Sequence, residues 1–173
     1  NEQPQGSPGK TRFYINLVVK YASVKKLDFL LGVDFAAQEK SDIYDTTGSA
    51  TLLSGLLAIR YNFYPKFYLS TRGEYYEDNS GILSGLYTDN SGGSIGLKAE
   101  GFAFTLEFDP TVNSYVRVDT RFIKAGNDLY IFTHGDSPSE ERTEITLGDG
   151  IEFKINNSRS LKIQHLKFTM IPK

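Results

Sequence analysis

The amino-acid sequence predicts an all-β fold: an antiparallel, up-and-down transmembrane β-barrel with about eight strands in this chain. Three observations predict it. Successive segments alternate apolar and polar residues with a period of two, which is the side-chain period of a β-strand. Short connections alternate with long polar ones, as turns and loops do at the two rims of an outer-membrane barrel. Charged residues collect on one face of the segments and leave the other face nearly uncharged.

The composition suits one domain and excludes several classes of function. A formal net charge of -2 over 173 residues argues against a nucleic-acid partner, whose phosphates require a basic surface. The chain has no cysteine, so a disulfide framework, a thiolate metal site and a cysteine nucleophile are excluded. With only two histidines, neither a metal nor a cofactor is expected. No apolar run approaches the roughly 18–20 residues of a membrane helix.

The domain organisation follows from where the alternation begins and ends. Residues 1–10 are predicted to be a flexible leader, and residues 11–153 to contain the strands of the barrel. The first two strands, at 13–21 and 27–36, are close enough in sequence to form a hairpin. Residues 154–173 are expected to add one more strand, at 161–171, or to form a tail.

The remaining strands are expected at 50–63, 67–76, 94–108, 114–123 and 142–153. The first of these is apolar on both faces in its middle, as a helix would be, but its β-branched and aromatic end favours a strand. The alternation shifts phase near Gly101, which predicts a β-bulge there. Pro65 and Pro110 mark tight turns on the same rim, because proline cannot donate to a strand ladder.

The lengths of the connections predict the orientation of the barrel. Short connections at 22–26, 64–66 and 109–113 alternate with long ones at 38–49, 77–93 and 124–141. Outer-membrane barrels have short periplasmic turns and long external loops. The sequence therefore predicts a protein of the bacterial outer membrane, with lipid as its main partner.

One face of the predicted strands carries charges of both signs. A charge near the membrane midplane costs about 2–4 kcal/mol, so this face should line a wet or salt-bridged interior. The residues predicted to line the lumen are Arg60, Arg72, Glu74, Glu107, Arg117, Asp119 and Arg121. Within this set, Arg72 is expected to pair with Glu74. Asp119 is expected to pair with Arg117 or Arg121.

Aromatic side chains gather near the strand ends on the uncharged face. Such rings prefer the level of the lipid headgroups. An aromatic girdle at the periplasmic rim is expected from Tyr21, Phe63, Phe67, Phe108 and Phe153. The alternative is that these rings pack in the core of a soluble protein.

Three stretches carry a family resemblance. Residues 69–81, LSTRGEYYEDNSG, contain an Arg-x-Glu-aromatic-aromatic-x-Asp stretch at a strand-to-loop junction. Residues 104–122, FTLEFDPTVNSYVRVDTRF, contain an Arg-x-Asp-x-Arg ladder, and residues 143–153, TEITLGDGIEF, end in an aromatic residue. From about residue 11 to residue 153 the chain resembles the OmpL-like β-barrel porin family of Gram-negative bacteria. The resemblance implies a porin-like passive channel of the outer membrane.

The chain departs from this family in two ways. Family members are larger, and about 20 residues follow Phe153, where such barrels usually stop. About eight strands leave an interior just filled by side chains, whereas open pores need roughly sixteen. Eight strands suffice for a small barrel without an open pore, so this chain alone is expected to conduct poorly, and transport would require further strands or another chain.

His134, Asp136 and Ser137 are the residue types of a catalytic triad and lie close together in sequence. Spacing within one loop does not supply the required geometry, so a polar loop is expected and the chain is not expected to be an enzyme.

Two alternatives stay open. A soluble calycin-like barrel that binds a small apolar ligand would turn the apolar face inward, although the Gly-x-Trp of lipocalins cannot occur without tryptophan. A structural or adhesive outer-membrane barrel would differ from a porin only by a blocked lumen.

Overall fold

The computed structural model describes the backbone of residues 10–24, 26–45, 47–134, 136–155 and 159–170, and the side chains of these ranges apart from 23–24 and 151–170. The strands are β1 (Arg12–Val24), β2 (Leu27–Gln38), β3 (Ala50–Tyr64), β4 (Phe67–Asp78), β5 (Tyr87–Thr88), β6 (Ser94–Ile95), β7 (Leu97–Thr111), β8 (Ser114–Ala125), β9 (Phe132–His134), β10 (Ser137–Ser139), β11 (Glu141–Ile155) and β12 (Arg159–Met170). The described residues contain no helix long and apolar enough to cross a membrane.

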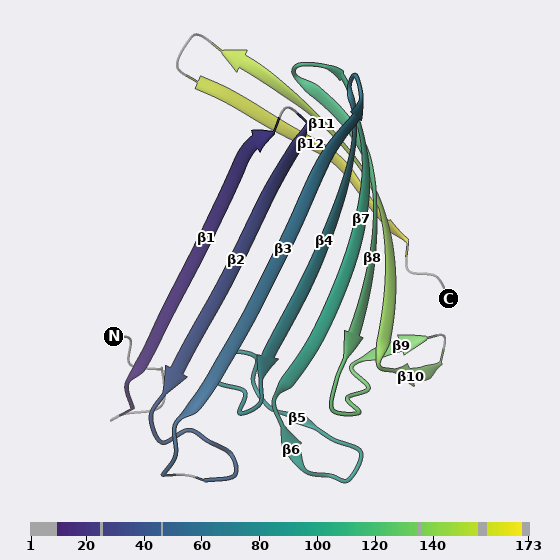
Figure 1. Cartoon of the computed structure of the whole chain (residues 1–173). Coiled ribbons are helices and arrows are strands. Elements are labelled where there is room, and N and C mark those ends of the chain that lie inside the picture. The colour runs from purple at the N-terminus through teal and green to yellow at the C-terminus, as the bar shows by residue number, and fades with distance from the viewer. Residues whose placement is uncertain (1–9, 25, 46, 135, 156–158, 171–173) are drawn as a thin grey trace.

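The eight long strands form one antiparallel sheet in the order β1-β2-β3-β4-β7-β8-β11-β12 (Figure 1). Each strand pairs with the next long strand along the chain, so the predicted all-β, up-and-down architecture is confirmed. The described parts of β1 and β12 each pair with one neighbour only, and the sheet is open at these two edges rather than closed into a barrel. Two small hairpins, β5–β6 and β9–β10, lie in the long loops.

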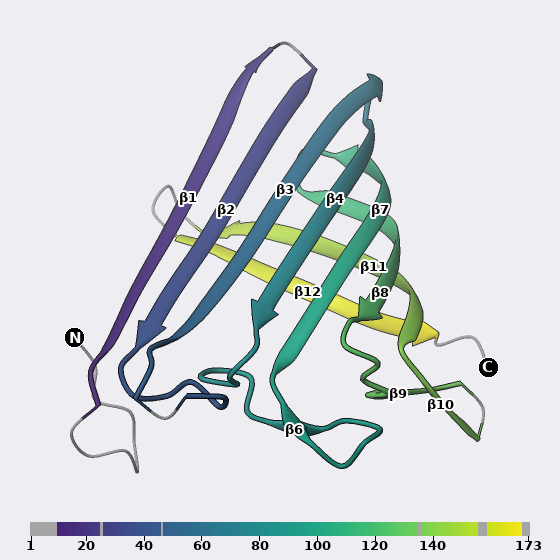
Figure 2. The same cartoon turned by 60° about the horizontal axis from the view of Figure 1, so that its bottom comes forward.

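The sheet is strongly curved. β11 and β12 cross behind β3 and β4 in both views of the molecule (Figures 1 and 2). A twisted antiparallel sheet that curls in this way has one concave and one convex face.

The short turns lie at one end of the sheet and the long connections at the other (Figure 1). The ammonium of Lys66 donates to the carbonyl of Pro110 at 2.6 Å, and the amide of Asp109 donates to the carbonyl of Lys66 at 2.8 Å. The turn that contains Pro65 therefore lies beside Pro110 on one rim, as predicted. Pro110 itself is part of the end of β7.

The predicted β-bulge near Gly101 is wrong. Gly101 pairs with Glu74 on one side and Ile123 on the other, in ladders that run without a shift through this part of β7. The apparent change of phase arises because Lys98 and Glu100 lie on the same face as Phe102, so the polarity of the two faces is reversed at this end of the strand. The irregularities of β7 and its neighbours lie next to the short turns instead, for example between Phe108 and Thr111.

The two ends of the chain bear on the predicted organisation in different ways. The leader predicted at residues 1–10 lies outside the described residues, apart from Lys10. Beyond residue 153, β11 continues to Ile155, and β12 pairs with it as the last strand of the sheet. Residues 50–63, for which a helix was the competing interpretation, belong to β3.

Candidate functional site

The register divides the sheet into two faces, because residues that pair directly across antiparallel strands point to the same side. One row of direct partners crosses six strands: Gly32, Leu56, Glu74, Gly101, Ile123 and Arg142. We call the side to which this row points the charged face. All of the residues predicted to line the lumen lie on it: Arg60, Arg72, Glu74, Glu107, Arg117, Asp119 and Arg121.

The opposite side, the apolar face, presents large side chains that stay exposed. Leu57 is 52% exposed and Leu106 48%, although both lie in long strands at the middle of the sheet. Most charged residues of this face lie near the strand ends: Glu77, Lys98, Glu100, Lys124 and Glu141. Asp149 is the exception and lies inside β11, opposite Val116. A continuous exposed apolar surface of this kind marks contact with an apolar partner.

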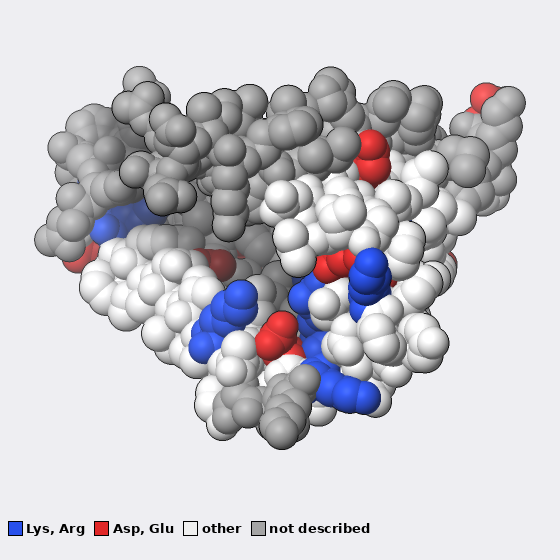
Figure 3. Space-filling model, turned by 90° about the horizontal axis from the view of Figure 1, so that it is seen from above, with Lys and Arg blue, Asp and Glu red and all other residues white. Residues whose placement is uncertain are grey.

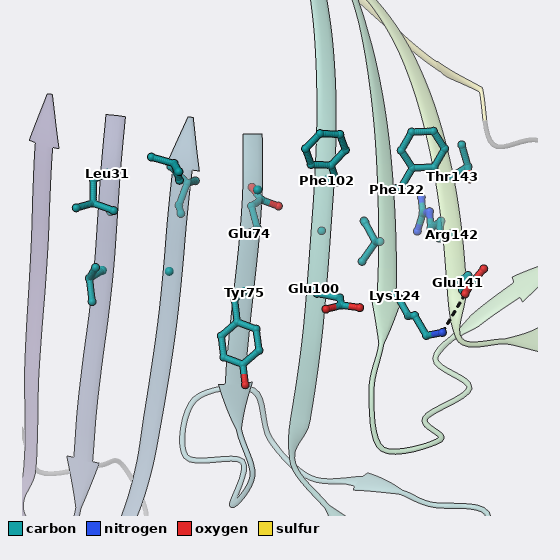
Figure 4. Close-up of a pocket in the computed structure, with 18 residues that line it drawn as sticks. Leu31, Glu74, Tyr75, Glu100, Phe102, Phe122, Lys124, Glu141, Arg142 and Thr143 are labelled. Atoms are coloured by element: carbon teal, nitrogen blue, oxygen red, sulfur yellow. Dashed lines mark ion pairs between the residues drawn. The ribbon is translucent and has the colours of Figure 1, made fainter. Parts of the chain in front are cut away.

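The charged face lines a hollow. The row from Gly32 to Arg142 lines a cavity of about 730 Å³, and its lining residues come from every strand between β2 and β11 that belongs to the large sheet (Figure 4). A single cavity can touch this many neighbouring strands only on the concave side of a curved sheet. Basic and acidic side chains gather in this hollow when the molecule is viewed from above (Figure 3). An adjoining cavity of about 380 Å³ is lined by Asp34 and Arg121, among others.

The arginines of the charged face reach across strands to carboxylates. Arg60 Nη2 lies 2.5 Å from Glu107 Oε1, on the second strand over, and the Arg60 guanidinium lies 3.6 Å from the ring centroid of Tyr68. Arg121 Nη2 lies 2.5 Å from Glu74 Oε2, again skipping one strand. About one third of each arginine side chain is exposed to solvent, and the carboxylates are somewhat less exposed. Solvent therefore screens both ion pairs, and each contributes modestly to stability.

The predicted pairing within the charged face is partly confirmed. Arg72 Nε lies 2.9 Å from Glu74 Oε1, as expected. Asp119 forms no ion pair with Arg121, and its carboxylate accepts a hydrogen bond of 2.6 Å from the Thr105 hydroxyl. Positions two apart in a strand are separated by about 6.6 Å, and the aspartate side chain is one methylene shorter than the glutamate that bridges this gap.

Arg117 differs from the other arginines of this face. Its guanidinium lies 5.3 Å from the ring centroid of Tyr115. Among the described side chains, no carboxylate lies within ion-pair distance of it. The short-turn end of the hollow therefore holds a cation that has no neutralising partner among these side chains.

Aromatic rings cluster where the girdle was predicted. Phe67 stacks on Phe108 with ring centroids 4.6 Å apart, and Phe63 lies 6.2 Å from Phe67. Tyr21, at the same end of the sheet, is 55% exposed. The side chain of Phe153 lies outside the described residues. These rings are placed as a girdle requires, and their contact with headgroups stays a prediction.

The loop that contains His134 folds as a small hairpin. Ser137 pairs with His134 through the backbone in β9–β10, and both side chains are exposed. Among the described residues, no hydrogen bond joins these two side chains, and no group of three potential metal ligands occurs. The arrangement does not align a nucleophile with a base.

Asp78 is a buried anchor that the sequence interpretation missed. Its carboxylate is fully buried and accepts hydrogen bonds from the backbone amides of Ile82, Leu83 and Ser84, each at 2.9 Å. Arg12 Nη2 donates to the carbonyl of Ile82 at 2.6 Å, which ties this loop to β1. An aspartate at a strand end before Asn-Ser-Gly is a recognisable turn signal, but its burial is not.

Two other loop carboxylates hold exposed turns. The hydroxyl of Thr47 donates to Asp45 and holds the pKa of that carboxyl below its ordinary value. The hydroxyl of Ser91 does the same for the pKa of Asp89. Both aspartates therefore stay ionised and stabilise their turns above acidic pH.

A family model described as "Putative beta-barrel porin-2, OmpL-like" matches residues 1–153. Neither the curated proteins nor the solved structures gave a significant match. The match covers most of the chain, including β1–β8 and nearly all of β11, and it confirms the resemblance seen in the sequence.

Proposed function

Because the chain belongs to the OmpL-like family of β-barrel porins, we propose that it forms part of a passive channel in the bacterial outer membrane. The division of the sheet into two faces carries this proposal. The apolar face would meet lipid, and the charged face would line an aqueous path for solutes. The channel function requires no catalytic group.

The exposure of the apolar face weighs against a soluble calycin-like barrel. In that fold the apolar side chains would fill the interior and the charged ones would meet water. Here the exposed side chains include Leu57, Leu106 and Phe104, whereas the arginines and carboxylates pair inside the hollow. Exposed leucine and phenylalanine gain free energy from lipid that water does not supply.

Completion of the barrel is part of the proposal. Backbone N–H and C=O groups at an open sheet edge have no partners in lipid, and each such group costs several kcal/mol. The described edges of β1 and β12 pair on one side only. Further strands, or another chain, would close the barrel at these edges, with the short turns in the periplasm and the long loops outside.

Removing two cations from the charged face should change the ion preference of the channel. The double variant Arg117→Ala, Arg121→Ala is expected to shift the preference toward cations, because Arg117 has no described counter-charge and Glu74 would keep only Arg72. The measurement is the reversal potential in planar lipid bilayers under a KCl gradient. Lys124→Ala is the matched control, since it removes a cation from the same strand on the opposite face.

An unchanged reversal potential in the double variant would mean that these arginines do not line the ion path. A shift of equal size in Lys124→Ala would also contradict the assignment of faces. Absence of any conductance from the barrel completed by its further strands or partner chain would leave a structural or adhesive barrel as the function.

A further inference from the structure

The row of direct partners in the middle of the hollow carries apolar pairs on both sides of Glu74. Gly32 and Leu56 pair directly on β2 and β3, and Gly101 and Ile123 pair directly on β7 and β8. We call these four residues the apolar wall. A methyl group added at Gly32 would lie 3.7 Å from its nearest heavy atom, the Cβ of Leu56. This is an ordinary van der Waals contact, so the cavity has room for a side chain at this position. The cavity of about 730 Å³ falls within the roughly 300–1,000 Å³ of small-molecule sites.

Guanidinium groups border this wall on one side. Arg142 belongs to the same row, and Arg72 and Arg121 belong to the next row toward the short turns. Where these two rows cross β4, β7, β8 and β11, the described residues include only two carboxylates, Glu74 and Glu144. The arginines therefore outnumber the carboxylates that neutralise them, and this part of the hollow favours an anion.

The ion pairs can rearrange for an incoming carboxylate at low cost. If Arg121 turned from Glu74 toward a ligand, the Glu74 carboxylate would still be paired, because Arg72 Nε lies 2.9 Å from it. Arg142 Nη2 lies 2.8 Å from Glu144 Oε1, but the Nε groups of Arg121 and Arg142 are buried and have no hydrogen-bond acceptor among the described residues. A carboxylate supplies two acceptor oxygens and suits the forked donors of arginine.

We propose that this cavity binds small organic acids that carry one carboxylate on an apolar body. The carboxylate is held by Arg121 and Arg142, and the apolar body lies against the apolar members of the row, Gly32, Leu56, Gly101 and Ile123. This inference rests on the proposed channel, since it names the class of solute that the charged face accepts. An amine of the same shape meets the arginines and is repelled, while a small anion such as acetate gains nothing from the apolar wall.

The test measures binding of three probes to the protein in lipid nanodiscs by isothermal titration calorimetry, with empty nanodiscs as the blank. Phenylacetate is expected to bind at least about tenfold more tightly than acetate, because each buried CH₂ is worth roughly a fourfold change in affinity. Phenylethylammonium, which has a similar apolar body and the opposite charge, is expected not to bind. Equal affinities of phenylacetate and acetate would overturn the inference.

Two variants separate the wall from the charges. Gly32→Val fills the wall and should weaken phenylacetate binding about tenfold while leaving acetate unchanged. Gly55→Val is the matched control: Gly55 borders the cavity with its backbone, but it pairs with Val33 and Tyr75, so an added side chain points to the apolar face, where its Cβ meets nothing within 4 Å. Arg142→Gln should weaken both anions. Equal effects of the two glycine variants on phenylacetate would contradict the proposed site.

The same protein tested for conductance distinguishes this inference from the channel itself. Ion conductance without preferential phenylacetate binding would overturn the solute class and leave the channel. Preferential binding without conductance by the completed barrel would overturn the channel and leave a binding site for organic acids.

Discussion

Replacing Leu106 with arginine is expected to destabilise the folded, membrane-inserted protein by about 2–4 kcal/mol. Leu106 lies on the apolar face of β7, pairs directly with Leu69 and Val118, and is 48% exposed. In lipid, an arginine at this position must either lose its hydration or distort the bilayer. Its direct partners, Leu69 and Val118, offer no carboxylate to neutralise it. The measurement is the free energy of unfolding by urea in lipid vesicles.

Thr105→Arg is the matched control for this prediction. Thr105 is the preceding residue of β7 and lies on the charged face, where its hydroxyl donates to Asp119 at 2.6 Å. An arginine there gains a carboxylate partner and should change the free energy of unfolding by less than about 1 kcal/mol. If both arginines had the same effect, the two faces would not differ in the medium they contact.

Replacing Gly96 with alanine is expected to destabilise the protein by about 3 kcal/mol, because no room exists for a methyl group. A Cβ at this position would lie 1.8 Å from the carbonyl oxygen of Asp78 and 2.6 Å from backbone atoms of Asn79 and Gly81. These are backbone atoms, which cannot rotate away as a side chain does. The substitution would also break the 2.9 Å hydrogen bond from the Gly96 amide to Asn79.

The effect of Gly96→Ala should appear in thermal unfolding and in faster proteolysis of the loop at 79–96. Gly73→Ala is the control, since a Cβ at Gly73 meets nothing within 4 Å and its backbone φ is not positive. Unchanged melting and proteolysis in Gly96→Ala would mean that this loop does not pack against the end of β4 as described.

The strands could be predicted because their faces differ in polarity. The alternation from Phe13 to Tyr21 lies within β1, and the expected strands at 67–76 and 114–123 extend by only two residues in β4 and β8. β5–β6 and β9–β10 were missed, because strands of two or three residues are too short to show a period. The alternation of polar and apolar residues within a strand does not indicate whether the edges of the sheet are open or paired.

The charged face could be predicted for the same reason, but its contacts could not. Residues two positions apart in a strand share a face. The alternation within each strand therefore placed Arg121 and Glu74 on the same charged face of the sheet. Their ion pair joins residues 47 apart in sequence and depends on the register of β4, β7 and β8. The false bulge at Gly101 shows the limit of the method, since charged residues near a strand end, such as Lys98 and Glu100, can lie on the otherwise apolar face.

The central claim is that the apolar face contacts lipid and the charged face contacts water. Because the chain has no cysteine, spin labels can be attached to single cysteines introduced one at a time along residues 102–108 of β7. In lipid vesicles, labels at Phe102, Phe104, Leu106 and Phe108 should collide mainly with dissolved oxygen. Labels at Ala103, Thr105 and Glu107 should collide mainly with a water-soluble nickel chelate. The opposite alternation, with the nickel chelate reaching the phenylalanines and Leu106, would contradict the assignment of the two faces.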